Sequence, residues 1–307
     1  MIDGGLERSL RARVAPGRGA PPLGVARALE RVRTQHGVDF SGARARAGFS
    51  RGHLIDVVVS LPGGSGNRSE REAARELLVA FLGEGRAADW LGEVAVEPAP
   101  RSGLLKVLDV RAPSASFFPV AELPDTFEHA IAGLYAGLPE EPLWSLGGEE
   151  LWTMLEASAE PAEDYAAQDD LLLASTYLPE MLKCFLAGSP FSSSRFSRRD
   201  ELFSYLKVEG HGGDPRLSLS ARRVLEDALD AALVSERAGR VVGSGLGIRY
   251  WYVDFALARV DRAVAVVSDV ARRVGLPEKS WLLFCDSELD DAWAPIHPRA
   301  PVPPRDP

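Results

Sequence analysis

The sequence predicts an α+β protein in which two β-α-β-containing units, ferredoxin-like or similar, flank a helical middle segment. A strand–helix–strand pattern occupies residues 244–286, a similar pattern occupies residues 53–110, and the residues between them have the composition of helices. The predicted segments are a basic arm at 1–50, an α+β unit at 51–118, a mainly helical segment at 119–215, an α+β unit at 216–298 and a disordered tail at 299–307.

The C-terminal unit has the clearest pattern. Residues 248–257 are aromatic and β-branched on both faces, as expected for a central strand. One face of this strand carries Tyr250, Tyr252, Asp254 and Ala256. The other face carries Trp251, Val253, Phe255 and Leu257. Apolar residues then recur at three- and four-residue steps, which predicts a helix at 260–274. Gly275 suits the left-handed position after that helix, and residues 281–285 form a short buried strand.

The N-terminal unit begins with a predicted strand at 53–60. Ser69 with Glu72 three residues later has the spacing of a capping box, so a helix is expected to start there. Two further strands are predicted at 93–97 and 104–110. Together these elements give a β-α-β-β order.

The middle segment is rich in residues that favour helices. Helices are predicted at 125–138, 149–157 and 169–186, with an interruption near Pro179, and a short helix is predicted to follow Asp200. A further helix at 220–236 leads into the C-terminal unit through a glycine-rich connection.

Charge is unevenly distributed along the chain. The whole chain of 307 residues has a net charge of −9, whereas residues 1–51 contain ten arginines and four acids, a net +6. The acidic balance argues against a nucleic-acid binder except through the arginine-rich arm, and it suits a basic protein partner. The arm is expected to be partly disordered, with one short helix at 25–36.

The composition also indicates the cellular compartment in which the protein is expected. No apolar run approaches the roughly 20 residues of a membrane span, and the N-terminus lacks the apolar region of a secretory signal. The two cysteines, Cys184 and Cys285, lie in apolar runs and are expected to be buried thiols. We therefore expect a cytoplasmic protein without a membrane association.

A glycine-rich loop precedes the first predicted helix and is a candidate anion site. Gly64, Gly66, Arg68 and Ser69 would present backbone N–H groups and a cation at a helix N-terminus. The loop lacks the lysine of a P-loop and the spacing of a dinucleotide fingerprint. A plain flexible connection is the alternative.

The acidic run after the last strand is a candidate cation site. Asp286, Glu288 and Asp290 have the initial spacing of a calcium loop. The turn glycine is replaced by Asp291 and the twelfth position is His297, so the run is not an EF-hand. A solvated acidic edge, or a docking patch for a basic partner, is the alternative. No cysteine or histidine spacing indicates zinc.

Asp56 and Asp254 are the candidate catalytic carboxylates, because each interrupts an apolar strand where burial can raise a pKa. Structural aspartates are the alternative.

Two functions remain open. One is a non-catalytic acidic partner-binding protein of the inhibitor, immunity or assembly-adaptor type. The other is an enzyme of an unrecognised family that uses strand carboxylates with a metal or a phosphate-bearing ligand. No motif identifies a cofactor or the oligomeric state.

Overall fold

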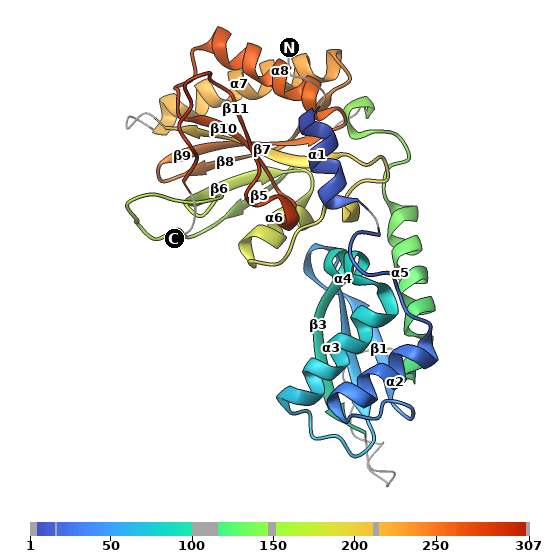
Figure 1. Cartoon of the computed structure of the whole chain (residues 1–307). Coiled ribbons are helices and arrows are strands. Elements are labelled where there is room, and N and C mark those ends of the chain that lie inside the picture. Colours follow the sequence, from blue (N-terminus) through green and yellow to red (C-terminus); the bar gives the residue numbers. More distant parts are fainter. Residues whose placement is uncertain (1–4, 16, 100–115, 147–151, 211–214, 305–307) are drawn as a thin grey trace. The chain divides into compact units, whose positions relative to one another are not determined.

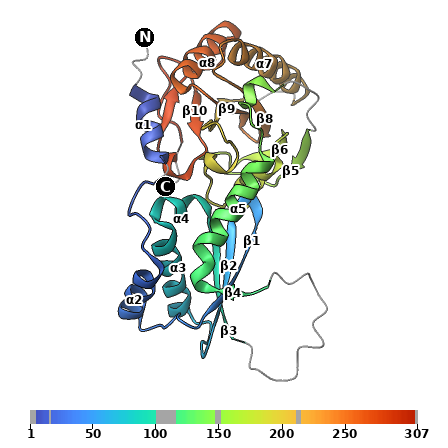
Figure 2. The same ribbon diagram turned by 90° about the vertical axis from the view of Figure 1, so that its right-hand side faces the viewer.

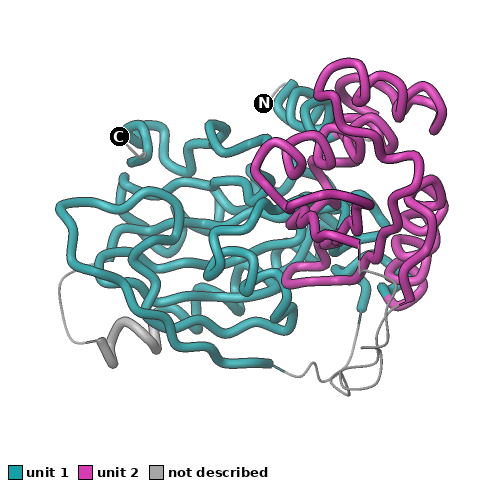
Figure 3. Tube along the Cα trace, turned by 90° about the horizontal axis from the view of Figure 1, so that it is seen from below, with its two compact units in different colours: residues 1–14, 138–307 teal, residues 15–137 magenta. Residues whose placement is uncertain are grey.

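The computed structural model describes residues 5–15, 17–99, 116–146, 152–210 and 215–304. Within these ranges the chain is mixed α+β, with eight α-helices and two sheets, so the predicted α+β class is confirmed. The chain forms two compact units, drawn in two colours in Figure 3. Unit 1 comprises Met1–Val14 and Leu138–Pro307, and unit 2 comprises Ala15–Gly137. These units do not coincide with the five predicted segments.

Unit 2 is built on a four-stranded sheet of order β3-β2-β1-β4. Its elements are α2 (Val25–His36), β1 (Arg44–Phe49), β2 (Ile55–Leu61), α3 (Arg68–Leu82), α4 (Glu84–Trp90), β3 (Leu91–Pro98), β4 (Phe118–Pro119) and α5 (Leu123–Gly137). β2 and β3 are parallel, whereas β1 is antiparallel to β2 and β4. α3 and α5 pack against the sheet, and α2 packs against α3 (Figures 1 and 2). The predicted strand–helix–strand pattern is confirmed here, and the strand predicted at 104–110 lies outside the described residues.

Within the segment predicted as a basic arm at 1–50, the helix predicted at 25–36 is confirmed as α2. The described residues of that range also form α1 (Gly5–Val14) and β1. Leu10 of α1 joins the core of unit 1, and the guanidinium of Arg11 donates to the carbonyls of Asp200 and Ala258 at 2.7 and 3.0 Å. Arg18 forms an ion pair of 2.7 Å with Asp89 in unit 2. These arginines therefore hold folded segments in place.

Unit 1 is built on a seven-stranded sheet of order β11-β10-β7-β9-β8-β6-β5, in which every paired strand is antiparallel to its neighbour. Besides α1, its elements are β5 (Thr153–Glu156), β6 (Leu171–Thr176), α6 (Pro179–Leu186), β7 (Leu202–Glu209), α7 (Pro215–Ser235), β8 (Gly239–Gly247), β9 (Tyr250–Leu257), α8 (Val260–Val274), β10 (Ser280–Phe284) and β11 (Trp293–Pro295).

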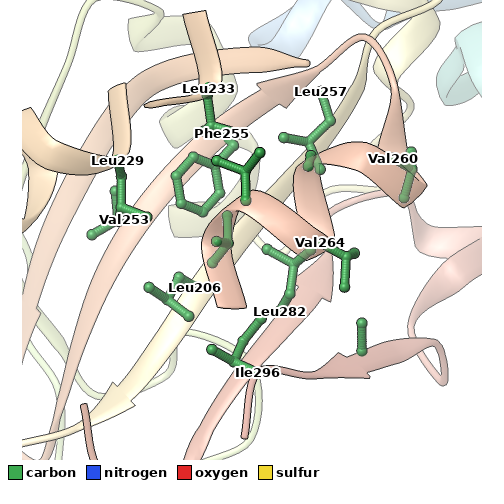
Figure 4. Close-up of a cluster of buried hydrophobic side chains, with 14 of the residues drawn as sticks. Leu206, Leu229, Leu233, Val253, Phe255, Leu257, Val260, Val264, Leu282 and Ile296 are labelled. Atoms are coloured by element: carbon green, nitrogen blue, oxygen red, sulfur yellow. The ribbon is translucent and has the colours of Figure 1, made fainter. Parts of the chain in front are cut away.

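One face of this sheet, here called the helix face, is covered by α7 and α8 (Figures 1 and 2). Figure 4 shows Val253, Phe255 and Leu257 of β9 meeting side chains from both helices. The opposite face, here called the loop face, carries Tyr250, Tyr252 and Asp254 of the same strand. It is covered by α6 and by loop segments that contribute Tyr165, Phe191 and Phe196. The predicted assignment of β9 residues to two faces is confirmed.

The C-terminal strand–helix–strand pattern is also confirmed, with one difference in the sheet. The left-handed Gly275 (φ 73°) ends α8 as predicted, and all five residues of β10 are buried. β7 lies between β9 and β10 and is antiparallel to both. The order in space is therefore β10-β7-β9-β8, although the chain order is β7-α7-β8-β9-α8-β10.

Three of the helices predicted in the middle segment are wrong. Residues 153–156, 171–176 and 202–209 are the strands β5, β6 and β7. Leucine, methionine and glutamate favour helices locally, but pairing within a sheet overrides this preference. In β7 both faces are buried, and one of them includes Lys207, so the alternation that marks a half-exposed strand is absent. The helix at 179–186 is confirmed as α6. In the segment predicted as a tail at 299–307, the Pro301 carbonyl accepts a hydrogen bond of 2.6 Å from the Trp281 indole.

The glycine-rich connection before β9 is the strand β8. A Cβ atom at Gly243 would lie 2.7 Å from a carboxylate oxygen of Asp254, and one at Gly247 would lie 2.3 Å from Asp170. Glycine therefore makes room in β8 for larger side chains of neighbouring segments.

The core on the helix face gives a stability prediction. Phe255 is fully buried, so Phe255→Ala should lower the free energy of unfolding by roughly 3–5 kcal/mol through lost burial and a cavity. Val224 on α7 is 64% exposed, and Val224→Ala should change it by less than about 0.5 kcal/mol. Urea denaturation followed by tryptophan fluorescence measures both. Equal effects of the two substitutions would contradict the assignment of this core.

Candidate functional site

The loop face of unit 1 has a lysine at its centre. Lys207 on β7 is fully buried, and its ammonium group donates to the carbonyls of Tyr165, Ala166 and Ala167 at 2.5, 3.0 and 3.0 Å. It lies 4.2 Å from the centroid of the Tyr250 ring. Burial lowers the pKa of Lys207 to about 8, and nearby aspartates oppose this effect. Lys207 therefore binds a loop through its backbone.

Asp170 fixes the end of that loop. Its carboxylate is fully buried and accepts the hydroxyl of Tyr252 and the N–H groups of Arg249 and Tyr250, the latter two at 2.7 and 2.9 Å. Lys207 and Asp170 thus hold residues 157–170, here called the acidic loop, against the sheet.

Asp254, a predicted catalytic residue, lies in β9 beneath the acidic loop. It is 6% exposed and accepts a hydrogen bond of 2.9 Å from the side-chain amide of Gln168. Burial raises the pKa of Asp254 from 3.8 to about 6, although the Gln168 bond lowers it. A carboxyl group in this state can exchange a proton near neutral pH.

Asp56, the other predicted catalytic residue, lies in β2 of unit 2. Its carboxylate accepts the Ser50 hydroxyl at 3.0 Å and the Glu93 N–H at 2.8 Å. It thereby joins the start of β3 to the turn before β2. Asp56 and Asp254 therefore belong to different units, and each is hydrogen-bonded within its own.

The predicted anion loop is occupied by the chain's own carboxylate. Glu70 accepts the N–H groups of Ser65, Gly66 and Asn67 at 3.0, 2.6 and 3.3 Å. The capping box is formed by Asn67 and Glu70, so the predicted box of Ser69 and Glu72 is wrong.

The other predicted residues of this loop have separate structural roles. Arg68 pairs with Glu72 at 2.7 Å, and the Gly64 N–H donates to the Leu61 carbonyl at 3.0 Å. Gly66 has a φ of 70°, and a Cβ atom there would lie 2.6 Å from the Val96 carbonyl.

The three residues of the predicted cation site do not converge. Asp286 is buried and accepts the N–H of Ser193 at 2.7 Å and its hydroxyl. Glu288 and Asp290 are exposed. The described residues include no group of three or more His, Cys, Asp or Glu side chains that could hold a metal ion. Asp286 connects the loop at residues 192–195 to the end of β10.

Cys184 and Cys285 are free and buried, as predicted. Burial raises the pKa of both thiols. Nucleophilic thiols need the opposite shift, toward the thiolate.

A long acidic segment runs from residue 130 to residue 182. It contains eleven acids and no lysine, arginine or histidine, so its charge exceeds that of the whole chain. Its acids are Glu140, Glu141, Glu149, Glu150, Glu156, Glu160, Glu163, Asp164, Asp169, Asp170 and Glu180. The carboxylates of Glu156, Glu160 and Glu163 are exposed and have no ion pair among the described residues. A count of charge along the chain would have indicated this surface, which motif searching missed.

No known protein family, curated protein or solved structure matches this chain. Among the described helices, none is both long and apolar enough to cross a membrane.

The occupied anion loop gives a testable prediction. Glu70→Ala removes the capping box and leaves three N–H groups without a partner, so the free energy of unfolding should fall by about 1 kcal/mol. Because a helix N-terminus binds anions, 20 mM sulfate should stabilise Glu70→Ala more than it stabilises the unmodified protein. Glu72→Ala is the control, since Glu72 pairs only with Arg68 at the surface. An equal response of all three proteins to sulfate would contradict this role of Glu70.

Asp254 gives a prediction about pH. Because its folded pKa is about 6 and its ordinary value is 3.8, the folded protein retains a proton between these values that the unfolded chain has lost. Ionised Asp254 therefore reduces stability as the pH rises through 6. Asp254→Asn should be more stable than the unmodified protein by on the order of 1–3 kcal/mol at pH 7.5, and the difference should shrink below pH 5. Thermal unfolding at a series of pH values tests this, and a variant that is less stable at pH 7.5 would refute it.

Proposed function

We propose that this protein is a cytoplasmic, acidic partner-binding protein without catalytic activity, of the inhibitor, immunity or assembly-adaptor type. Its partner contributes a basic extended segment that pairs with β5 as an eighth strand of the sheet. The observation that carries the proposal is the position of β5, a strand at the sheet edge inside the stretch of eleven acids and no basic residue.

The outer edge of β5 supports pairing with another strand. The Ala157 N–H donates to the Leu172 carbonyl at 3.0 Å and continues the register of β5 with β6. Hydrogen-bonded residues alternate along an antiparallel ladder, so the backbone N–H and C=O groups of Met154 and Glu156 point away from β6. Such groups are a template for an added strand.

Exposed apolar side chains lie on and beside the same strand. Met154 is 69% exposed and Trp152 is 46% exposed, and Leu172 of β6 is 39% exposed. The Trp152 ring packs edge-on against Tyr177, with 5.6 Å between centroids. A partner strand could therefore gain apolar burial in addition to backbone hydrogen bonds.

The negative charge beside β5 favours a partner segment that is positively charged. A basic segment beside β5 would meet the exposed carboxylates of Glu156 and Glu160. A second copy of this chain would instead bring like charges together across the new strand pair, which is unfavourable. A basic partner is therefore favoured over self-association.

The polar groups of the loop face support a binding role. Lys207, Asp170 and Asp286 are each committed to hydrogen bonds that hold loops on the sheet. General acids and nucleophiles need a free position facing a substrate.

We also infer that the part of unit 1 from β7 to β10 is of the ferredoxin-like type. The chain order β7-α7-β8-β9-α8-β10 and the spatial order β10-β7-β9-β8 support this. β5 and β6 then extend that core to the proposed binding edge.

The experiment combines capture with edge variants. The immobilised full chain is incubated with a lysate of the cells that produce it, and the protein retained in stoichiometric amount is identified and purified. Its Kd is then measured for the unmodified chain, Met154→Pro and Glu156→Lys. Proline is tolerated on an edge strand where the N–H faces outward, so Met154→Pro removes a donor without breaking β5. Each variant should weaken binding roughly tenfold or more, and salt should weaken binding to the unmodified chain.

The control is Asp227→Lys, since Asp227 is an exposed acid of α7 and its variant should bind within about twofold. If Met154→Pro and Glu156→Lys bind the partner normally, the proposed edge is wrong. If no stoichiometric partner is retained, the proposed function is wrong. Analytical ultracentrifugation that finds a dimer lost in Met154→Pro would replace the basic partner with a second copy.

A further inference from the structure

The loop face of unit 1 also contains a cavity of about 410 Å³. Tyr205, Leu283 and Cys285 line it from the sheet, and Phe191 and Trp293 line it from the surrounding segments. Its volume is within the range of small-ligand sites, and its walls are largely aromatic and apolar.

Two buried polar side chains of the cavity lining have free hydrogen-bonding capacity. Tyr205 is 4% exposed, and its hydroxyl has no hydrogen-bond partner among the described residues. Gln168 is 9% exposed and uses its Nε2 group to donate to Asp254. Because an ionised carboxylate can only accept hydrogen bonds, the amide atom of Gln168 that faces Asp254 must be the nitrogen. The Gln168 Oε1 atom is then left as an acceptor for another group. Neither atom is among the buried side-chain atoms that lack a partner, and both residues line the cavity. Each atom can therefore accept a hydrogen bond from a ligand that donates one.

The charge of the lining indicates the same class of ligand. Asp286, Asp290 and Asp291 line the cavity, and no described lining residue is Lys, Arg or His. Asp286 is bonded to Ser193 and Asp291 is paired with Arg13. Asp290 is exposed and has no ion pair among the described residues. Burial, together with Cys285, Asp169 and Asp254, raises the pKa of Tyr205 well above its ordinary value, in keeping with negative surroundings.

We propose that this cavity binds a guanidinium or ammonium group on a short apolar stem. The stem packs between the aromatic walls, the cation donates to Tyr205 and Gln168, and the carboxylate of Asp290 lies at the rim. Aromatic faces attract such cations as well. The site is separate from the β5 edge and does not depend on the proposed function. The same chemistry is present in a free small cation and in an arginine side chain of a protein.

The test is isothermal titration of the full chain with N-butylguanidinium. N-butylurea is the matched neutral probe, because it has nearly the same shape without the charge. The cation should bind saturably and at least about tenfold more tightly than the urea, because charged hydrogen bonds are the stronger ones. The peptide acetyl-Gly-Arg-Gly-amide separates the two sources. If the peptide binds with an affinity within about threefold of that of N-butylguanidinium, the natural ligand is an arginine side chain of a protein. If N-butylguanidinium binds and the peptide does not, the natural ligand is a small molecule. Both results support the site.

Variants then locate the binding. Tyr205→Phe should lower the affinity for N-butylguanidinium roughly tenfold by removing the hydroxyl, with circular dichroism to check folding. Asp290→Asn should lower it about threefold to fivefold, and because Asp290 is exposed this variant does not depend on the core. Glu163→Gln is the matched control, since it removes one exposed charge outside the cavity lining.

The proposal is overturned by an absence of saturable binding or by equal affinity for the urea. It is also overturned if Glu163→Gln weakens binding as much as Asp290→Asn does, because the attraction would then come from net charge. A failure in this experiment leaves the β5 edge unaffected, since the probes are not strands.

Discussion

The buried ammonium group of Lys207 is the interaction on which the loop face of unit 1 depends. An unpaired charge at this depth would be strongly unfavourable, so three backbone carbonyls of the acidic loop must remain in place around it. The acidic loop supplies backbone carbonyls, and not carboxylates, to Lys207. The acidic side chains that lie before residue 165 in the chain are therefore free to face solvent. The same interaction that closes the core therefore leaves the side chains of Glu156, Glu160 and Glu163 exposed to solvent.

Carboxylates hold loops in place in both units by accepting backbone N–H groups. In unit 2, Glu70 turns back and accepts N–H groups of the loop before its own helix, and Asp56 completes the backbone hydrogen bonding at the start of β3. In unit 1, Asp170 and Asp286 secure loops, while the exposed acids remain at the surface. The hydrogen bonds of buried Asp170 thus fix the end of the acidic loop, which carries exposed acids.

Sequence reasoning found some residues of the candidate site and missed others. Asp254 could be singled out because a carboxylate in an apolar strand is unusual, and its pKa is raised by burial as expected. Lys207 could not, because the residues that justify its burial are 40 positions away at the acidic loop. Tyr205 was missed for a related reason, since its free hydroxyl becomes noticeable only when α6, the acidic loop and the turn after β10 surround it.

The sequence by itself determined the α+β class, the helix α8 with its glycine end, and the two faces of β9. These features depend on residues close together in the chain. Only the tertiary structure decided that residues 153–156, 171–176 and 202–209 are strands, because their pairing partners are remote and their local preferences are helical. It also decided that β8 is a strand, since its glycines are needed only where Asp254 and Asp170 approach. Contacts between distant residues outweigh local preference wherever both faces of a strand are buried.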